Sequence, residues 1–155
     1  METLTFEEFI RRYNGLYKEN NGIYHRLARH FGLSDSAFSI LYTLRETQGQ
    51  VSQSQLCGEL FLSKQTVNSA LKQLEQEGYL TLENLPGSRR SKGIQVTARG
   101  EELLQRVADP VLALEERAYG HLTLEERQQV LELGEKLLQA LRQEAGALLD
   151  EGEEG

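Results

Sequence analysis

The fold is decided by the stretch LSKQTVNSALKQLEQEGYL, residues 62–80, which predicts an amphipathic helix with an unusual polar face. Its apolar residues Val67, Ala70, Leu71 and Leu74 recur at the i, i+3, i+4, i+7 spacing of a buried helix face. Residues 62–74 include two lysines but no aspartate or glutamate, although the chain has a net charge of −7. The polar face of this helix therefore lacks the carboxylates that are frequent elsewhere in the chain.

Length and composition favour one folded domain with helical extensions, since 155 residues with 39% apolar content are enough for a core. The single cysteine, Cys57, and the scattered histidines His25, His30 and His121 show no metal-ligand spacing. We therefore expect no metal and no cofactor. The chain has no long apolar run and no signal-peptide pattern, which predicts a cytoplasmic protein without a membrane span.

The charges are distributed unevenly along the chain. Residues 62–100 contain six basic and three acidic side chains, whereas residues 101–155 contain five basic and fourteen acidic ones. The segment that surrounds the predicted helix is thus the positive part of an acidic protein, which matters more for nucleic-acid binding than the total charge. The acidic end, residues 151–155, is predicted to be a disordered tail.

Around this helix, the sequence predicts a winged helix-turn-helix within residues 34–100. Ser52 is placed to cap a short helix that precedes the turn, and Ser63 to cap the helix of the opening stretch. After Gly78 the apolar period changes to alternation on both sides of PGSRRSKG, residues 86–93, which is typical of a β-hairpin with a basic tip. The predicted fold class is therefore mainly α with a small β-wing.

Long amphipathic helices are predicted at both ends of the chain, in residues 1–31 and 101–150. The first has apolar residues at helical spacing from Phe6 to Phe31, and the last begins at a T-x-x-E capping box formed by Thr123 and Glu126. Such apolar stripes would expose more apolar surface than a monomer tolerates. We therefore expect these regions to form a homodimer, with an interface built from residues 6–17 and 130–149.

The carboxylate-free face is the property that a helix needs in the DNA major groove, where acidic side chains are repelled by phosphates. Lysine, glutamine, asparagine and serine can instead donate hydrogen bonds to phosphates or to base edges. The basic hairpin tip is placed to reach the flanking phosphates or the minor groove. The residues predicted to contact DNA are Ser52, Ser63, Lys64, Gln65, Thr66, Asn68, Ser69, Lys72, Arg89, Arg90, Ser91 and Lys92.

Two segments, LCGELFLSKQTVNSALKQLEQEGYL (56–80) and SRRSKGIQVTARG (88–100), resemble the MarR family of bacterial transcriptional regulators. The wing of that family commonly reads D-x-R-x-K, and this sequence matches its basic positions but has Ser88 in place of the aspartate. The resemblance implies a homodimer that represses a promoter by binding a palindromic, double-stranded DNA operator. It also implies release by a small aromatic or phenolic effector, for which Tyr13, Tyr17, Tyr24 and Tyr42 are candidate contacts.

Two alternatives remain open at this point. A winged helix can bind another protein through the same surface, although an apolar recognition face would favour that function more than this polar one. A hydrolase that uses a serine or Cys57 with a histidine would need the pair within hydrogen-bond reach, and no histidine is near Cys57 in sequence. We therefore predict no enzymatic activity. For Cys57, a buried structural thiol is the expected state, and oxidant sensing is the alternative.

Overall fold

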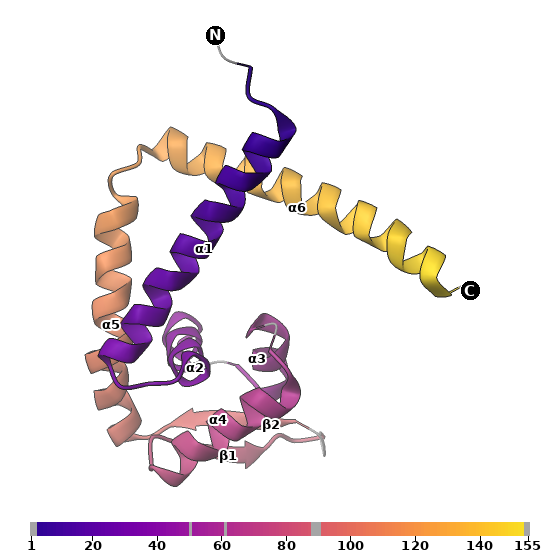
Figure 1. Ribbon diagram of the computed structural model, residues 1–155. Helices are drawn as coiled ribbons and strands as arrows, with labels where there is room; N and C mark the ends of the chain where they lie inside the picture. Colours follow the sequence, from indigo (N-terminus) through magenta and orange to yellow (C-terminus); the bar gives the residue numbers. More distant parts are fainter. Residues whose placement is uncertain (1–2, 50, 61, 88–90, 154–155) are drawn as a thin grey trace. The chain divides into compact units, whose positions relative to one another are not determined.

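The computed structural model describes residues 3–49, 51–60, 62–87 and 91–153 (Figure 1). The predicted fold class is confirmed, because the described ranges form helices and a two-stranded antiparallel wing. In chain order the elements are α1 (Phe6–His30), α2 (Asp35–Glu46), α3 (Gln53–Leu60), α4 (Lys64–Gln76), β1 (Leu80–Asn84), β2 (Lys92–Val96), α5 (Ala98–Tyr119) and α6 (Leu124–Glu153). No helix in the described ranges is long and apolar enough to cross a bilayer.

The chain divides into two compact units, residues 1–111 and residues 112–155. The first unit contains the winged helix-turn-helix together with α1 and the first part of α5. This division differs from the expected one, which grouped α1 with residues 101–150, because the buried side chains of α5 up to Val111 belong to the core of the first unit.

Side-chain caps begin the helices, and the caps at Ser52, Ser63 and Thr123 lie at the residues predicted from sequence. Ser34, Ser52, Ser63 and Thr123 each accept a hydrogen bond from the backbone N–H three residues further on, at 3.1–3.2 Å. Glu126 completes the predicted capping box by accepting from the Thr123 N–H at 2.7 Å. These bonds satisfy backbone donors that have no partner inside the helix.

The predicted disordered tail is wrong in part, because α6 continues through Glu153. Residues 154–155 lie outside the described ranges. Because α6 is already formed up to Asp150, the next three residues only propagate it, and propagation is easier than starting a helix even though Gly152 is a poor helix former.

The core of the first unit includes side chains of α2, α3, α4, the hairpin and α5. Val67, Leu71 and Leu74 of α4 are at most 3% exposed, which confirms the predicted buried face of that helix. Facing side chains come from other elements and are equally buried: Ile40, Leu44, Leu56, Leu80, Ile94, Leu103, Leu104, Val107 and Val111. This packing fixes which side of α4 turns outward.

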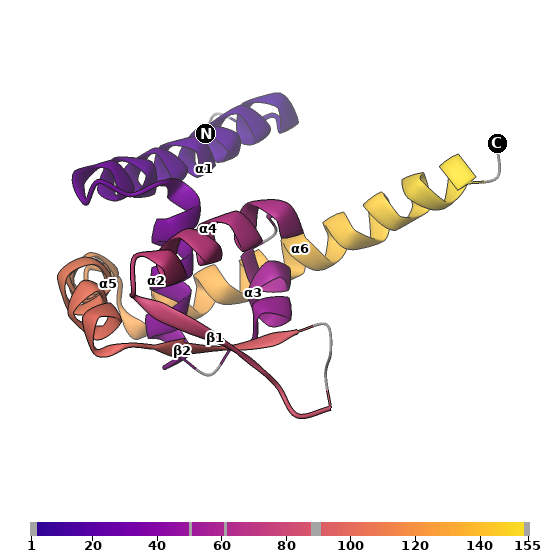
Figure 2. The ribbon, with the colours of Figure 1, turned by 90° about the horizontal axis from the view of Figure 1, so that it is seen from below.

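The hairpin pairs Leu80 with Val96 and Leu82 with Ile94, and an isolated antiparallel bridge joins Ser52 to Gly93 of β2. α3 contacts β2 and α4 contacts β1, so both helices lie on one side of the hairpin (Figure 2). The Glu75 carboxylate of α4 accepts a hydrogen bond from the Leu82 N–H at 3.3 Å. The wing is therefore fastened to both helices of the helix-turn-helix.

The junction between the wing and α5 is unusually tight. Thr97 donates through its hydroxyl to the Gly78 carbonyl at 2.6 Å and accepts from the Gly100 N–H at 3.0 Å. A Cβ added at Gly100 would lie 1.8 Å from the Tyr79 carbonyl oxygen. The first turn of α5 can therefore approach the start of β1 only because residue 100 has no side chain.

A second connection joins α2 to α5 through Arg45. Its guanidinium donates to Asp109 at 2.6 and 3.1 Å and to Glu101 at 2.8 and 3.3 Å. The hydrogen bond from Arg45 holds the pKa of Glu101 below its ordinary value. Bidentate arginine–carboxylate pairs have defined geometry, so Arg45 fixes two turns of α5 against α2.

Candidate nucleic-acid interface

Helix α4 presents the predicted polar face to solvent. Gln65, Thr66, Ser69 and Lys72 are exposed, whereas Asn68 is half-buried. Lys64, Asn68 and Lys72 follow one another at four-residue spacing, and they line a groove on the wing side of the helix. Gln65, Thr66 and Ser69 instead border a shallower depression that also includes Ser34 and Ser36. The polar face therefore has two flanks.

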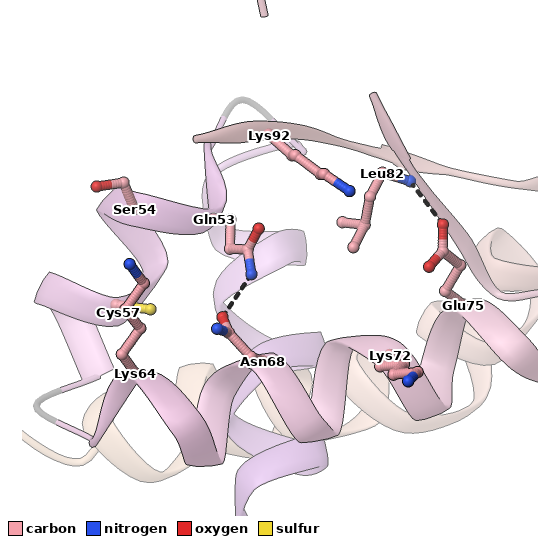
Figure 3. A pocket seen from close by; sticks show the side chains of 9 residues that line it. All are labelled: Gln53, Ser54, Cys57, Lys64, Asn68, Lys72, Glu75, Leu82 and Lys92. Carbon is pink, nitrogen blue, oxygen red and sulfur yellow. Dashed lines mark hydrogen bonds between the residues drawn. The ribbon is translucent and has the colours of Figure 1, made fainter. Parts of the chain in front are cut away.

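The groove on the wing side lies between α3, α4 and the hairpin and has a volume of about 580 Å³ (Figure 3). Its lining residues are Gln53, Ser54, Cys57, Lys64, Asn68, Lys72, Glu75, Leu82 and Lys92. Among the side chains that the structure describes, no carboxylate forms an ion pair with Lys64, Lys72 or Lys92. Three ammonium groups thus surround one groove, with the Glu75 carboxylate turned to the Leu82 N–H.

Two hydrogen bonds connect α3 to the other walls of this groove. The Gln53 Nε2 amino group donates to Asn68 Oδ1, which joins the first residue of α3 to the second turn of α4 (Figure 3). The Ser54 N–H donates to Ser91 Oγ at 3.3 Å, which joins α3 to the residue before β2. The positions of Asn68 and Ser91 are therefore set by contacts with α3.

The two cap serines, Ser52 and Ser63, stand at the N-terminal ends of α3 and α4. Each hydroxyl oxygen accepts from its own helix, and Ser63 also shares a 2.7 Å hydrogen bond with the Thr66 hydroxyl. Helix N-termini attract anions because their backbone N–H groups and dipoles point outward. Both ends are therefore suitable neighbours for a phosphate group.

The described members of the predicted DNA-contact set other than Ser91 lie in three places: Lys64, Asn68, Lys72 and Lys92 line the groove, Gln65, Thr66 and Ser69 border the depression, and Ser52 and Ser63 cap α3 and α4. Arg89 and Arg90 at the hairpin tip lie outside the described residues. Sequence reasoning missed Gln53, which follows the cap Ser52 and contacts Asn68. The signal that could have identified it is its position in the first helical turn, because this turn lies beside the recognition helix in a helix-turn-helix.

Cys57 differs from the expected buried thiol, since it is half-buried and lines the groove. The physical reason is that the short α3 buries Leu56 alone, so the next residue turns toward the groove. None of the nine residues that line the groove is a histidine. His25 instead forms a pair with Asp35 at 2.9 Å, between α1 and the first turn of α2.

The four tyrosines proposed as effector contacts do not share one environment. Tyr13 and Tyr17 are 43% and 64% exposed on α1, and Tyr13 stacks on Phe9 with ring centroids 5.8 Å apart. Tyr24 and Tyr42 are half-buried, on the helices α1 and α2 that contact each other. Tyr24 and Tyr42 therefore lie in more enclosed surroundings than the other two.

Comparison with known proteins agrees with this geometry. The family model described as MarR family matches residues 31–91, which include α2, α3, α4 and β1. The HTH-type transcriptional regulator PecS of Dickeya dadantii is 38% identical over 81 residues, a match that covers 51% of this chain and 49% of PecS. The chain is thus aligned with about half the length of that relative.

Solved structures match over more of the chain. NMB1585, a MarR family regulator from Neisseria meningitidis, has a TM-score of 0.77 at 16% identity, covering 88% of this chain and 96% of that one. The MepR–DNA complex of S. aureus has a TM-score of 0.65 at 19% identity, covering 91% and 99%. The segment of residues 31–91 is thus similar to the MarR family, and the solved structures share the winged-helix fold of the chain.

Proposed function

We propose that the chain is a homodimeric regulator that binds a palindromic operator in double-stranded DNA and represses transcription until a small aromatic effector releases it. The observation that carries DNA binding is the groove, where Lys64, Lys72 and Lys92 lie beside the carboxylate-free face of α4. Unpaired lysines on one concave surface of an acidic protein are typical of a phosphate-contacting surface. The MepR–DNA complex among the similar structures supports the same function.

Within this proposal the polar side chains have two kinds of role. The lysines of the groove neutralise backbone phosphates, and the cap serines Ser52 and Ser63 donate their hydroxyl hydrogens to phosphates at the helix N-termini. Gln65, Thr66, Asn68 and Ser69 read base edges in the major groove. The hairpin residues Arg89, Arg90, Ser91 and Lys92 contact the flanking backbone or the minor groove.

Exposed apolar side chains on the terminal helices support a homodimer. On α1, Phe6, Leu16 and Tyr17 are 64–73% exposed. On α6, Val130, Leu131, Leu133, Leu138, Leu141, Leu148 and Leu149 are 52–72% exposed. Surfaces of this kind on two long helices are characteristic of protein interfaces, and a two-fold axis would present two copies of α4 to successive major grooves.

The protein-binding alternative has less support. A winged helix that bound a protein through α4 would be expected to present apolar side chains there. The exposed residues of α4 are polar or charged, and Leu62, just before the helix, is 36% exposed. Polar hydrogen-bond donors next to unpaired lysines are better suited to binding DNA than to binding a protein partner.

Replacing Lys72 with alanine tests the proposed phosphate contacts. We expect the variant to bind all DNA sequences more weakly, because the lysine contacts the DNA backbone and not a base. The slope of log affinity against log salt should become shallower by about one unit for each phosphate that is no longer neutralised, hence by about two per dimer. Fluorescence anisotropy with a duplex operator, between about 50 and 200 mM salt, measures both quantities.

Lys18, exposed on α1, provides the matched control because Lys18→Ala removes the same charge away from α4. This variant should keep the affinity and the salt slope of the parent. If Lys72→Ala behaves in the same way as Lys18→Ala at every salt concentration, α4 does not bind phosphates and the protein-binding alternative replaces this proposal.

The effector part of the proposal is tested separately with a panel of phenolic acids. An effector of the parent should weaken operator binding by about 5- to 150-fold, the usual range of coupling between two sites. Tyr24→Ala should reduce that response without changing affinity for DNA in the absence of the acid. Tyr119→Ala, which alters an exposed tyrosine of α5, is the control. A panel that leaves DNA affinity and melting temperature unchanged would contradict an aromatic effector.

A further inference from the structure

The hydrogen bond between Gln53 and Asn68 has a direction that bears on base recognition. Gln53 donates through Nε2, and Asn68 accepts through Oδ1. Both side chains are half-buried, and they come from the two helices of the helix-turn-helix. The asparagine amide is therefore held at its oxygen end, and its amino group is left on the other side.

The amino group of Asn68 is available for a ligand. In Figure 3 it points away from Gln53, toward the part of the groove where Lys64 lies. Among the residues that the structure describes, no acceptor for Asn68 Nδ2 is found. Asn68 thus offers a hydrogen-bond donor, whereas its oxygen is already engaged.

An asparagine that is free to rotate commonly reads adenine with both ends of its amide, since the oxygen accepts from N6 and the amino group donates to N7. The hydrogen bond from Gln53 takes one of the two lone pairs of Oδ1 and fixes the orientation of the amide, which works against this bidentate mode. The remaining N–H donor pairs instead with any base that presents an acceptor in the major groove, which is O6 or N7 of guanine, O4 of thymine or N7 of adenine. Cytosine presents only the N4 donor there and gives it no partner.

We propose that Gln53 is a specificity-determining positioning residue, which orients Asn68 as a donor so that it binds a base with a major-groove acceptor and rejects cytosine. This inference rests on the proposed DNA-binding function. A base is favoured over a phosphate as the partner because Lys64 and Lys72 stand one turn before and one turn after Asn68 on the same flank. The two lysines supply the phosphate contacts, and the neutral Asn68 amino group between them adds selectivity for a base.

Reversing the direction of the hydrogen bond between residues 53 and 68 should change the preferred base. Glutamate at position 53 can only accept, so in Gln53→Glu the Asn68 amide must turn its amino group toward residue 53 and its oxygen toward DNA. An acceptor prefers an amino base, which is adenine through N6 or cytosine through N4. Asn68→Asp should give the same new preference by another route, because its carboxylate accepts from Gln53 and presents a second oxygen.

The experiment uses the full-length protein and operator duplexes in which each half-site position is randomised in turn, with bound and free DNA sequenced. The parent should disfavour cytosine at one symmetry-related position by about three- to tenfold, the value of one hydrogen bond. Both variants should reverse this preference and favour cytosine or adenine at that position. Gln55→Glu is the charge control, since Gln55 is exposed and its Oε1 accepts from the Ser52 N–H, as a glutamate also can.

Gln55→Glu should weaken binding to all sequences alike and leave the base preference unchanged. If Gln53→Glu and Asn68→Asp keep the base preference of the parent, or lose affinity uniformly as Gln55→Glu does, the inference is overturned while the proposed DNA binding stands. A parent that enriches no sequence at all would overturn the proposed function and this inference together. Thermal melting of each variant shows whether it is folded. If one of the two variants does not fold, the base preference of the other variant still tests the inference.

Discussion

Replacing Gly100 with alanine is expected to lower the free energy of unfolding by about 3 kcal/mol, a large effect for the addition of one methyl group. The new Cβ would lie 1.8 Å from the Tyr79 carbonyl oxygen and 2.8 Å from Val96 Cγ1. A backbone carbonyl cannot rotate away as a flexible side chain does, so β1 and α5 must separate. Urea denaturation followed by circular dichroism, at one fixed protein concentration, measures the change.

The matched control for this substitution is Gly58→Ala in α3. A Cβ at Gly58 would have no atom within 4 Å. Alanine is a better helix former than glycine, so this variant should gain about 0.5–1 kcal/mol. The same glycine-to-alanine substitution is thus expected to lower the free energy of unfolding at residue 100 and to raise it at residue 58. A Gly100→Ala protein as stable as the parent would contradict the tight junction between the wing and α5.

Replacing Leu141 with glutamate is expected to disrupt the homodimer and to reduce operator affinity by about 100-fold, since a separated protomer loses the avidity of two linked half-sites. Leu141 is 55% exposed, so a charge there would cost a monomer little. In a dimer the same charge would be buried without a partner. Light scattering should show the mass falling toward the 17.6 kDa of one chain.

Gln139→Glu adds the same charge on the opposite side of α6, because two residues correspond to about 200° of helix rotation. That control should remain a dimer and bind DNA as the parent does. If Leu141→Glu also remains a dimer with parental affinity, the exposed apolar face of α6 is not the interface.

Local signals explain why much of the fold was predictable from sequence. Ser52, Ser63 and Thr123 were predicted as caps because a cap depends on residues three positions apart. The buried face of α4 followed in the same way from helical spacing. These features need no knowledge of which elements meet.

The features that were missed depend on tertiary contacts. Arg45 lies 56 residues from Glu101 and 64 from Asp109, so no local pattern connects them. Gln53 and Asn68 meet only after α3 packs against α4. The half-burial of Cys57 likewise depends on how few side chains the short α3 buries. The sequence therefore predicted the buried and polar faces of α4, but not which side chains of other elements contact that helix.

The central claim, that two copies of α4 related by a two-fold axis read one palindrome, is tested most directly by changing the distance between half-sites. Affinity is measured by anisotropy for duplexes in which the same two half-sites are centred about 10 or about 15 base pairs apart. With about ten base pairs per turn, only the first spacing places both major grooves on one side of the duplex. The account predicts that the longer spacing weakens binding about 100-fold, and equal affinity for the two duplexes would contradict it.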